Sequence, residues 1–353
     1  MAKVDSGVPV SCKIIIDDVT KQQWERYASE FSDYSIYQTW AYQQVRAETG
    51  RQQLCRVVIT DGNSQILTIC QIRIKNAKLL GMKIGYVQWG PLLRNKDGQI
   101  VCTVEALTEL CKAFVGRRLN VLRIVPNVPS DDTGGKAADI IRNAGFKFVK
   151  FVRPYHTIVL SLNCSEDVLR SRLHQSWRRK LKKAEQAGIE VRETSDAQSF
   201  EILQSQYREM LKRKNFRHLD LEVFAQSQRL LSPSEKMNVI VAYQNGEPVT
   251  THVTSNLGDT GLLLLVASNG KGFECGSSYL AWWRAVTNCE SRGMKKYDVG
   301  GVDFRHNPTV SEFKAGLGGE DCRYIGAFEA CDDWYTKLKW RIAEKAYNYI
   351  KGG

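Results

Sequence analysis

The feature that most constrains the fold is an alternation of short apolar strands and amphipathic helices, which runs through the whole chain and occurs twice. Each half contains two consecutive strand patterns joined by an Asx-Gly turn, at Asp61-Gly62 in the first half and at Asn245-Gly246 in the second. An Asx-Gly pair between two apolar runs is a strong hairpin signal, because both residue types tolerate positive φ. The sequence therefore predicts an α/β (α+β) chain with two similar halves, a duplication of pattern and not of residues.

The length of the chain indicates how the halves are divided. A chain of 353 residues fits two domains, at roughly 100–200 residues per domain. We place the boundary near Pro154, with one domain over residues 1–155 and another over 156–321. Within the second half, the pattern predicts one long helix over 165–187. Near the C-terminus it predicts a last strand over 324–329 and a last helix with apolar residues at every fourth position, which needs a surface to pack against.

Charge and composition narrow the classes of partner. The formal net charge of +12 favours polyanionic partners such as nucleic acid, nucleotide diphosphates or an anionic membrane surface. No apolar run approaches the ~20 residues that span a bilayer, so we expect a cytoplasmic protein without an integral membrane segment, for which peripheral membrane association remains open. The ten cysteines form no Cys-x-x-Cys pair and are expected to be reduced. We expect neither a metal site nor a cofactor.

One segment concentrates positive charge without any acidic residue. Seven cations occur within the fourteen residues 170–183, while apolar residues at every fourth position mark one buried face. A helix whose exposed face is purely cationic suits a phosphate-rich partner such as tRNA, although a solvated helix face is the plainer interpretation. The candidate tRNA-binding residues are Arg178, Arg179, Lys182 and Lys183.

A second basic group follows a predicted helix, at Lys212, Arg213, Lys214 and Arg217. Cations at a helix–loop junction can hold a diphosphate, and they equally suit a helix C-terminus, where they compensate the helix dipole. Arg213 is the candidate for binding substrate.

Two glycine-rich segments near the C-terminus are candidates for chemistry. Residues 297–301 read Tyr-Asp-Val-Gly-Gly, and residues 313–316 read Phe-Lys-Ala-Gly. A strand that enters a Gly-Gly turn lets backbone amides approach a ligand closely, and a lysine nearby can stabilise a developing oxyanion or hold a phosphate. A structural loop with a surface lysine is the alternative. Residues 85–91, which include Tyr86 and end in Gly-Pro, close another strand. The five histidines show no ligand or triad spacing.

Together these segments resemble the Fem family of aminoacyl-tRNA-dependent transferases, within the acetyltransferase (GNAT) superfamily. The resemblance is carried by residues 38–46, by Tyr86 to Pro91 and by the two glycine-rich segments. It is also carried by Arg179 to Gly188, which look like the family's Arg-x-x-x-x-Lys-Ala-x-x-x-Gly helix. Their order and spacing agree with the family over nearly the whole chain.

The resemblance implies two tandem GNAT-like domains, with the final segment 322–353 completing the first. It implies an aminoacyl-tRNA donor and an amine acceptor on a nucleotide- or lipid-linked peptidoglycan precursor. Lys314 would be the catalytic residue near the donor's reacting end, and Arg46 and Arg213 would clamp the acceptor's diphosphate. The remaining substrate-binding residues would be Tyr86, Phe313, Asp298, Gly300 and Gly301.

The sequence departs from the family's pattern at two places. Longer members insert a helical arm in the second domain, for which residues 188–196 leave no room, so a compact form is expected. Arg46 stands where a lysine is expected, which keeps the charge and changes its geometry.

Two other functions remain open. One is acyl-CoA-dependent N-acyl transfer, which requires a loop of amides for a pyrophosphate. Residues 268–277 lie in the right place but lack the superfamily's glycine spacing. The other is a non-catalytic, basic RNA-binding protein that kept the fold.

Overall fold

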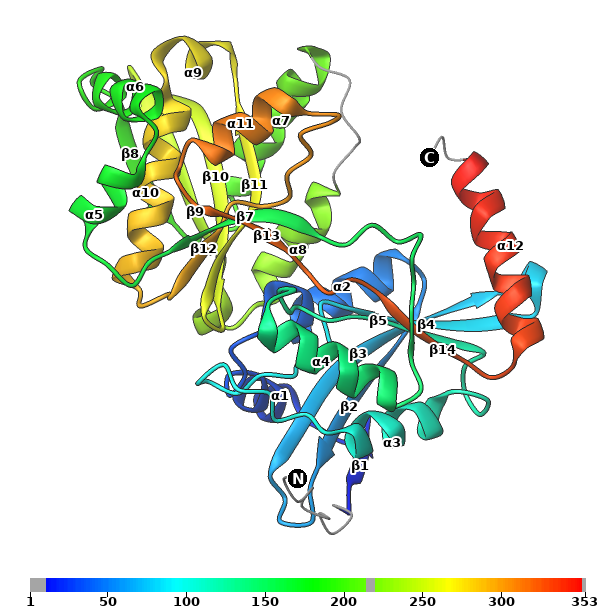
Figure 1. The fold of residues 1–353 in the computed structure, drawn as a ribbon. Helices are drawn as coiled ribbons and strands as arrows, with labels where there is room; N and C mark the ends of the chain where they lie inside the picture. Colours follow the sequence, from blue (N-terminus) through cyan, green and yellow to red (C-terminus); the bar gives the residue numbers. More distant parts are fainter. Residues whose placement is uncertain (1–10, 214–219, 351–353) are drawn as a thin grey trace. The chain divides into compact units, whose positions relative to one another are not determined.

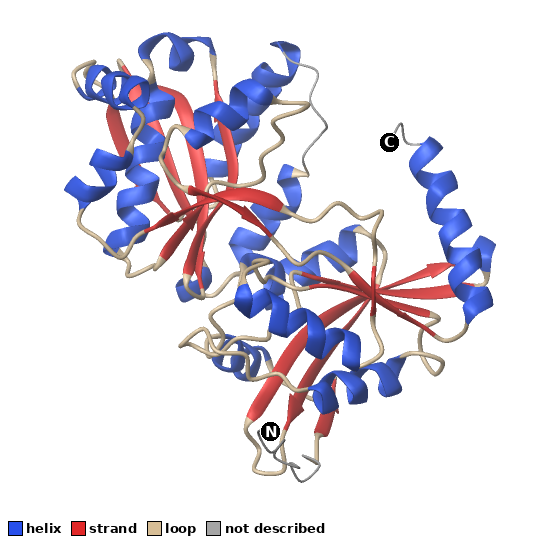
Figure 2. Cartoon of the chain, in the orientation of Figure 1, coloured by secondary structure: helices blue, strands red, loops and turns tan. Residues whose placement is uncertain are grey.

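A computed structural model describes residues 11–213 and 220–350 and contains two mixed β-sheets, each in its own compact unit (Figures 1 and 2). Unit 1 contains the chain up to Asp33, then Arg46–Pro154 and the segment from Tyr324 onward. Unit 2 contains Tyr34–Val45 and Tyr155–Arg323. The domain limits at residues 155 and 321 stay a prediction.

The sheet of unit 1 has the strand order β1-β2-β3-β4-β5-β14-β6. Its β14 is contributed by the C-terminal segment and lies between two strands from the first half of the chain. The strands are β1 Lys13–Ile16, β2 Gln53–Thr60, β3 Ile66–Ala77, β4 Met82–Gln88, β5 Val121–Val125, β6 Lys147–Phe148 and β14 Phe328–Cys331. The helices of this part of the chain are α1 Lys21–Ala28, α2 Trp40–Thr49, α3 Val104–Phe114, α4 Asp132–Asn143 and α12 Trp334–Ile350, with 3-10 turns η1 Ile36–Gln38 and η2 Lys78–Leu80.

The sheet of unit 2 has the order β13-β7-β12-β11-β10-β9-β8. The strands are β7 His156–Ser161, β8 Glu190–Thr194, β9 Asn238–Gln244, β10 Glu247–Leu257, β11 Thr260–Ser268, β12 Lys296–Asp298 and β13 Glu320–Arg323. The helices are α5 Glu166–Arg172, α6 Gln175–Glu185, α7 Ser199–Arg213, α8 Leu221–Leu230, α9 Gly270–Cys275, α10 Ser277–Ser291 and α11 Pro308–Ala315, with the 3-10 turn η3 Pro233–Glu235.

The two sheets correspond strand by strand. Sheet 1 read from β1 and sheet 2 read from β8 have the same sequence of pairings: three antiparallel pairs, one parallel pair, then two antiparallel pairs. The parallel pair is β4–β5 in one sheet and β11–β12 in the other. This agreement confirms that the two halves predicted from sequence share one fold.

Both predicted hairpins are present. The β9–β10 turn places Asn245 and Gly246 at φ of 51° and 80°, in the left-handed region where Asn and Gly are tolerated best. In the β2–β3 turn, Asp61 accepts hydrogen bonds from the backbone of Asn63 and Gln65, at 2.9 and 2.8 Å. These turns set the register of the meanders.

Each sheet has a helical layer that buries an apolar stripe. In unit 1, Leu107, Leu110 and Phe114 of α3 and Ile141 of α4 are fully buried against the sheet. In unit 2 the predicted stripe Leu169, Leu173, Trp177 and Leu181 is buried together with α10. The four-residue spacing therefore identified the core face, because only that face is removed from water.

Two element predictions were wrong. The long helix over 165–187 is two helices, because Leu173 and His174 are extended and the His174 amide donates to the Gly316 carbonyl instead of continuing the helix. The strand predicted over 324–329 begins only at Phe328, since Gly326 at φ of 84° breaks the extended backbone before it. The edge strand β13 was not predicted.

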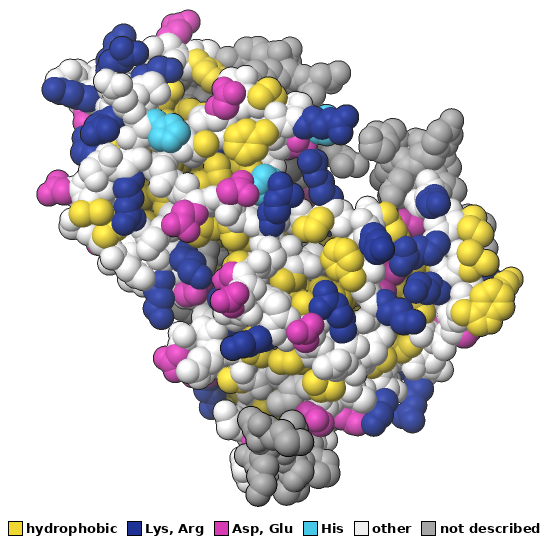
Figure 3. All heavy atoms as spheres, in the orientation of Figure 1, with side chains coloured by type: hydrophobic (Ala, Val, Ile, Leu, Met, Phe, Trp, Pro, Cys, Tyr) yellow, Lys and Arg dark blue, Asp and Glu magenta, His cyan; other side chains and the backbone are white. Residues whose placement is uncertain are grey.

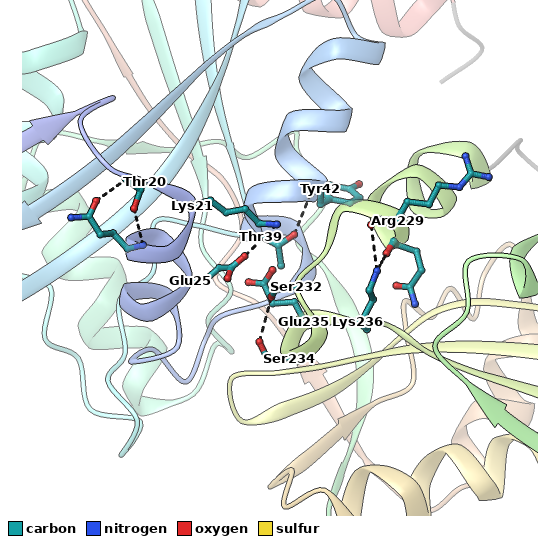
Figure 4. A network of polar contacts seen from close by, with 12 residues as sticks. Thr20, Lys21, Glu25, Thr39, Tyr42, Arg229, Ser232, Ser234, Glu235 and Lys236 are labelled. Carbon is teal, nitrogen blue, oxygen red and sulfur yellow. Dashed lines mark hydrogen bonds and ion pairs between the residues drawn. The ribbon is translucent and has the colours of Figure 1, made fainter.

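Side-chain caps close helices in both units (Figure 4). At the start of α1, Thr20 and Gln23 form a reciprocal capping box, which satisfies two free amides. At the end of α8, the Lys236 ammonium donates to the Gln228 and Arg229 carbonyls, where the helix dipole is negative. The cap on α8 fixes the entry into β9.

Two compositional expectations concern cysteines and membrane helices. All ten cysteines are free thiols, and burial raises the pKa of several of them, including Cys55 to about 12. In the part of the chain that the structure describes, no helix combines the length and the apolar character needed to cross a bilayer.

Adjacent glycines in α4 give a matched test of the packing in unit 1. A Cβ on Gly134 would lie 1.9 Å from the Pro129 carbonyl oxygen, whereas a Cβ on Gly135 has nothing within 4 Å. We expect Gly134→Ala to lower the free energy of unfolding by about 1–3 kcal/mol. Gly135→Ala should raise it by about 0.5–1 kcal/mol, because alanine is the better helix former. Denaturant unfolding measures both, and equal effects would contradict the packing described.

Candidate active site

The Asp298 carboxylate organises the end of β12. The side chain is fully buried, and its Oδ1 accepts hydrogen bonds from the Gly300 amide at 2.8 Å, from the Tyr155 hydroxyl at 3.1 Å and from the Thr157 hydroxyl. Burial raises the pKa of Asp298, and these three donors and the nearby Lys314 act in the opposite direction. A carboxylate held this way fixes the backbone that follows it.

That backbone leaves the sheet in a tight path. Gly300 has φ of 75°, and the Thr157 hydroxyl lies 2.9 Å from its carbonyl oxygen. Two residues later, the Val302 amide donates to the His156 carbonyl at 2.9 Å. Gly301 between them is exposed to solvent, so this turn lies at the surface of the unit.

Lys314 reaches the turn from the last part of α11. Its ammonium donates to the Gly301 carbonyl at 2.8 Å, and only 8% of the residue is exposed. Burial lowers the pKa of Lys314 to about 8, against the attraction of the Asp298 charge. The structure thus brings together Lys314, Asp298, Gly300 and Gly301, with a lysine that is still cationic at neutral pH beside an exposed backbone turn.

Sequence reasoning missed a group of buried polar side chains on the neighbouring strands, which are linked by hydrogen bonds. His252 of β10 is fully buried, with Nε2 3.1 Å from the Tyr297 hydroxyl and Nδ1 3.2 Å from the Thr254 hydroxyl. Burial, together with the charge of Lys314, lowers the pKa of His252 to about 3. The imidazole is therefore neutral and leaves Lys314 as the cation. The signal that could have drawn attention to it is a run of mostly polar residues, from Thr250 to Asn256, inside a predicted strand.

Phe313 belongs to an aromatic cluster that joins α11 to two other helices. Its ring centroid lies 5.7 Å from that of Trp177, 5.0 Å from Tyr279 and 5.4 Å from Trp282. The Trp177 indole also donates to the Phe313 carbonyl at 3.1 Å. A Cβ on Gly316 would lie 2.5 Å from the Trp177 ring, so glycine is required there. Phe313 thus holds α11 in place, and the substrate contact predicted for it stays a prediction.

The basic helix is attached to the Lys314 element through these same contacts. Trp177 lies on the buried face of α6, while Arg178, Arg179, Lys182 and Lys183 are exposed, and Lys and Arg side chains gather over α6 in Figure 3. Arg170 is taken up by an ion pair with Glu185, so not every cation of the run is available to a partner.

Three further predicted substrate-binding residues come from β4, α2 and α7. Tyr86 is half-buried on β4 of unit 1, and its ring centroid lies 5.5 Å from Cζ of Arg73. Burial raises the pKa of Tyr86. Arg46 is half-buried on α2 and belongs to unit 1. Arg213 is the last residue of α7, and its side chain, like residues 214 and 217, lies outside the described part of the structure. The diphosphate clamp stays a prediction.

Comparison with known proteins identifies the family. The sequence model that defines the FemAB family matches residues 19–260, more than two thirds of the chain. The chain belongs to the FemAB family. Curated proteins gave no match.

Solved structures support the same fold for this FemAB family member. The crystal structure of FemX has a TM-score of 0.78 at 14% sequence identity, and the alignment covers 92% of this chain and 99% of FemX. The C-terminal domain of a putative lysylphosphatidylglycerol synthetase from Agrobacterium fabrum has a TM-score of 0.54 at 12% identity, covering 93% and 98%. A conserved protein of unknown function from Bacteroides thetaiotaomicron has a TM-score of 0.56 at 10% identity, covering 90% and 99%.

These findings confirm the predicted family and the two-sheet α/β fold that the chain shares with FemX, and they support a transferase. The fold is the compact form, because only residues 186–189 separate α6 from β8 and no helical arm is inserted there. Among the residues that the structure describes, no group of three or more His, Cys, Asp and Glu side chains could hold a metal ion.

The two glycines of the turn give a matched test of the site. Gly300 has positive φ, and a Cβ there would lie 3.4 Å from the Lys314 ammonium and 3.3 Å from Leu263. A Cβ on Gly301 would meet only ordinary contacts, the nearest being Tyr155 at 3.5 Å. Gly300→Ala should therefore cost about 1–2 kcal/mol of stability and displace Lys314, and Gly301→Ala should be tolerated. Chemical unfolding and turnover report both effects; a tolerated Gly300→Ala would show that the turn is not constrained.

Proposed function

We propose that this protein transfers an amino acid from aminoacyl-tRNA to the amine of a phosphate-bearing acceptor, such as a nucleotide- or lipid-linked peptidoglycan precursor. The observation that carries the proposal is the buried Lys314 ammonium, held beside the exposed Gly301 turn in a member of the FemAB family. Because tRNA is cytoplasmic, we place the reaction in the cytoplasm.

The transfer reaction requires the protein to position the two reactants and to stabilise a developing negative charge. The neutral acceptor amine attacks the ester carbonyl carbon, and a C–N bond forms while negative charge develops on the carbonyl oxygen. The ester C–O bond then breaks, the ribose oxygen leaves, and the proton lost by the amine balances the one that this oxygen gains. Binding two reactants in line can supply ~7–11 kcal/mol of the barrier. Lys314 would stabilise the developing oxyanion or the leaving oxygen.

Burial is what makes Lys314 suited to this role. A cation removed from water interacts more strongly with a developing charge than a solvated one, because the local dielectric is low. The hydrogen bond to Gly301 leaves two of the three ammonium hydrogens for other partners. No described residue stands out as a general base, so we assign proton removal to a substrate group.

The donor would be held by the cationic face of α6. Arg178, Arg179, Lys182 and Lys183 are exposed on the helix that packs on α11 through Trp177. Phosphate contacts of this kind position nucleic acid without reading its sequence. On the acceptor side, we propose Arg46, Arg213 and Tyr86 as phosphate- and substrate-binding residues, as the family resemblance implies.

The contacts around α9 disfavour acyl-CoA as the donor. The Gly270 amide donates to the Glu209 carboxylate at 3.1 Å, and the Gly272 amide donates to the Asn269 side chain at 2.9 Å. Amides that would cradle a pyrophosphate are thus already paired, one of them with a negative charge that repels an anion. This leaves the aminoacyl-tRNA hypothesis ahead of acyl-CoA transfer.

The proposal is tested by incubating the protein with a pool of radiolabelled aminoacyl-tRNA and candidate acceptors, namely a nucleotide-linked peptide, a lipid-linked peptide and simple amines. Parallel reactions contain labelled acetyl-CoA. We expect label to move from tRNA to an acceptor. Transfer from acetyl-CoA alone would favour the acyl-CoA reaction, and RNA binding without any transfer would indicate a non-catalytic protein.

Replacing Lys314 tests the catalytic assignment. Lys314→Met keeps the length of the side chain and removes its charge, so turnover should fall about 10²–10³-fold, the usual loss for one oxyanion-stabilising group. Burial disfavours the charged form of Lys314, and this lowers the stability of the folded protein near neutral pH. The variant lacks the charge and should therefore be at least as stable as wild type. Lys271→Met, at an exposed lysine paired with Glu247, is the control. Normal turnover in Lys314→Met would remove Lys314 from the reaction.

The pKa of Lys314 gives this prediction a pH dependence. With a pKa of about 8, the side chain carries its charge below pH 8 and loses it above. The wild-type rate should therefore decline on the alkaline side with a midpoint near pH 8. The pKa of Lys314 is lower in the folded protein than its ordinary value. The buried charge therefore destabilises the folded state fully below pH 8, and this destabilisation disappears as the pH rises above 8. An alkaline limb that persists unchanged in Lys314→Met would contradict the assignment.

The cationic face of α6 is tested with two pairs of charges. Arg179→Gln with Lys182→Gln should weaken tRNA binding and lower the slope of log affinity against log salt by about 1–2, since each phosphate contact contributes about 0.7–0.9. Arg192→Gln with Lys271→Gln removes the same charge from the same unit, at exposed cations already paired with Glu190 and Glu247. Fluorescence anisotropy over a salt series compares them. Identical slopes for the two variants would mean that α6 makes no phosphate contact.

A further inference from the structure

Helix α12 exposes an unusual amount of apolar surface. The exposed fractions are 76% for Trp334, 61% for Tyr335, 50% for Leu338 and 62% for Ile342. Trp334, Leu338 and Ile342 are four residues apart, so they lie along one side of the helix, with Tyr335 beside them. We call these four residues the α12 stripe. Large apolar side chains gathered on one exposed face mark an interaction surface, whereas isolated ones do not.

The stripe is not the face that attaches α12 to unit 1. The opposite face carries Trp340, which packs against the apolar cluster of β4 and β5 and donates from its indole to Glu329 at 3.1 Å. On the same side, Glu344 pairs with Arg123 at 2.7 Å. The helix is thus held to the sheet by one face, and the stripe is left over after that docking.

The charges of α12 indicate what covers the stripe. The helix contains four cations, Lys337, Lys339, Arg341 and Lys345, and a single acidic residue, Glu344, which is already paired. At 100° per residue, Lys337 falls on one flank of the stripe and Lys339 on the other, and Lys345 continues it. Arg341 lies on the same flank as Lys337 but is paired with Glu329 at 3.9 Å. Figure 3 shows hydrophobic side chains over α12 next to Lys and Arg side chains. An apolar band bordered by cations complements a surface that is apolar inside and anionic outside.

We propose that the α12 stripe binds the surface of an anionic lipid membrane. The helix would lie in the plane of the interface, with the stripe inserted at the boundary between headgroups and acyl chains and the lysines among the phosphates. Trp and Tyr at one end suit this depth, because their rings are amphipathic. Each lysine near an anionic leaflet adds further attraction, which salt weakens. This surface holds the protein at a membrane without any spanning helix.

A lipid surface accounts for the pattern better than a second copy of the chain does. Self-association through the stripe would bring the flanking cations of two copies together, in a chain that already carries a net charge of +12. Like charges around an interface oppose association. An anionic bilayer instead neutralises the flanking lysines.

The test is vesicle flotation of the full chain, without tRNA or acceptor, so that its outcome is independent of the proposed transfer reaction. The vesicles contain phosphatidylcholine alone, or phosphatidylcholine with phosphatidylglycerol. We expect binding to the anionic vesicles that decreases with salt, and weak binding to the neutral ones. The triple variant Trp334→Ser, Leu338→Ser, Ile342→Ser should bind anionic vesicles at least about tenfold more weakly. Lys337→Gln with Lys339→Gln should reduce binding to anionic vesicles only.

A matched control removes three exposed apolar side chains from unit 2, Val168, Leu230 and Phe273, each replaced by serine. It should bind like wild type. The six substituted apolar side chains are exposed, Lys337 and Lys339 are partly exposed, and unfolding curves verify that each variant is folded. The proposal is overturned if wild type does not float with anionic vesicles, or if the α12 triple variant floats as wild type does. It is also overturned if sedimentation shows that the stripe holds two copies together while vesicles are not bound.

Discussion

The Lys314 site depends on one buried carboxylate. Asp298 sits at the end of β12 without solvent exposure, where an unpaired charge would be very costly, and three donors compensate it. One of these donors is the Gly300 amide, so the same interactions that satisfy Asp298 also set the backbone at Gly300 and Gly301. The Gly301 carbonyl then holds the Lys314 ammonium. The position of the cation is therefore determined by the sheet, two steps away.

A second set of contacts ties the lysine to the basic helix. The Trp177 indole of α6 donates a hydrogen bond to the Phe313 carbonyl, and its ring packs against Gly316. The His174 amide donates a hydrogen bond to the Gly316 carbonyl. These contacts interrupt the helix predicted over 165–187, and they fix the cationic face of α6 relative to α11. A donor whose phosphates lie on α6 and whose ester lies at Lys314 would thus meet a rigid element at both points, which favours orientation over induced movement.

Much of this was accessible from sequence, for reasons that differ between residues. Asx-Gly turns and four-residue apolar spacing act locally, so the hairpins and the buried face of α6 were predicted correctly. The break at Leu173 and His174 depends on Gly316, far along the chain, and no local pattern shows it. The same holds for Phe313, which proved to be an aromatic anchor, and for His252, whose neutrality depends on burial and on Lys314. The partners of Arg46 and Arg213 stay predictions, because a clamp is defined by distances that a sequence does not contain.

The most direct test of the central claim uses tRNA whose 3′-terminal ribose has been oxidised by periodate to a dialdehyde. An amine close to that terminus condenses with an aldehyde, with loss of water, and cyanoborohydride reduces the imine to a stable secondary amine. Peptide mass spectrometry then locates the bond. If the donor's reacting end lies at the Gly301 turn, Lys314 carries the modification, and its neutral fraction, set by a pKa of about 8, makes labelling rise from pH 7 to pH 9. Modification confined to the exposed lysines of α6, with Lys314 untouched, would contradict the account.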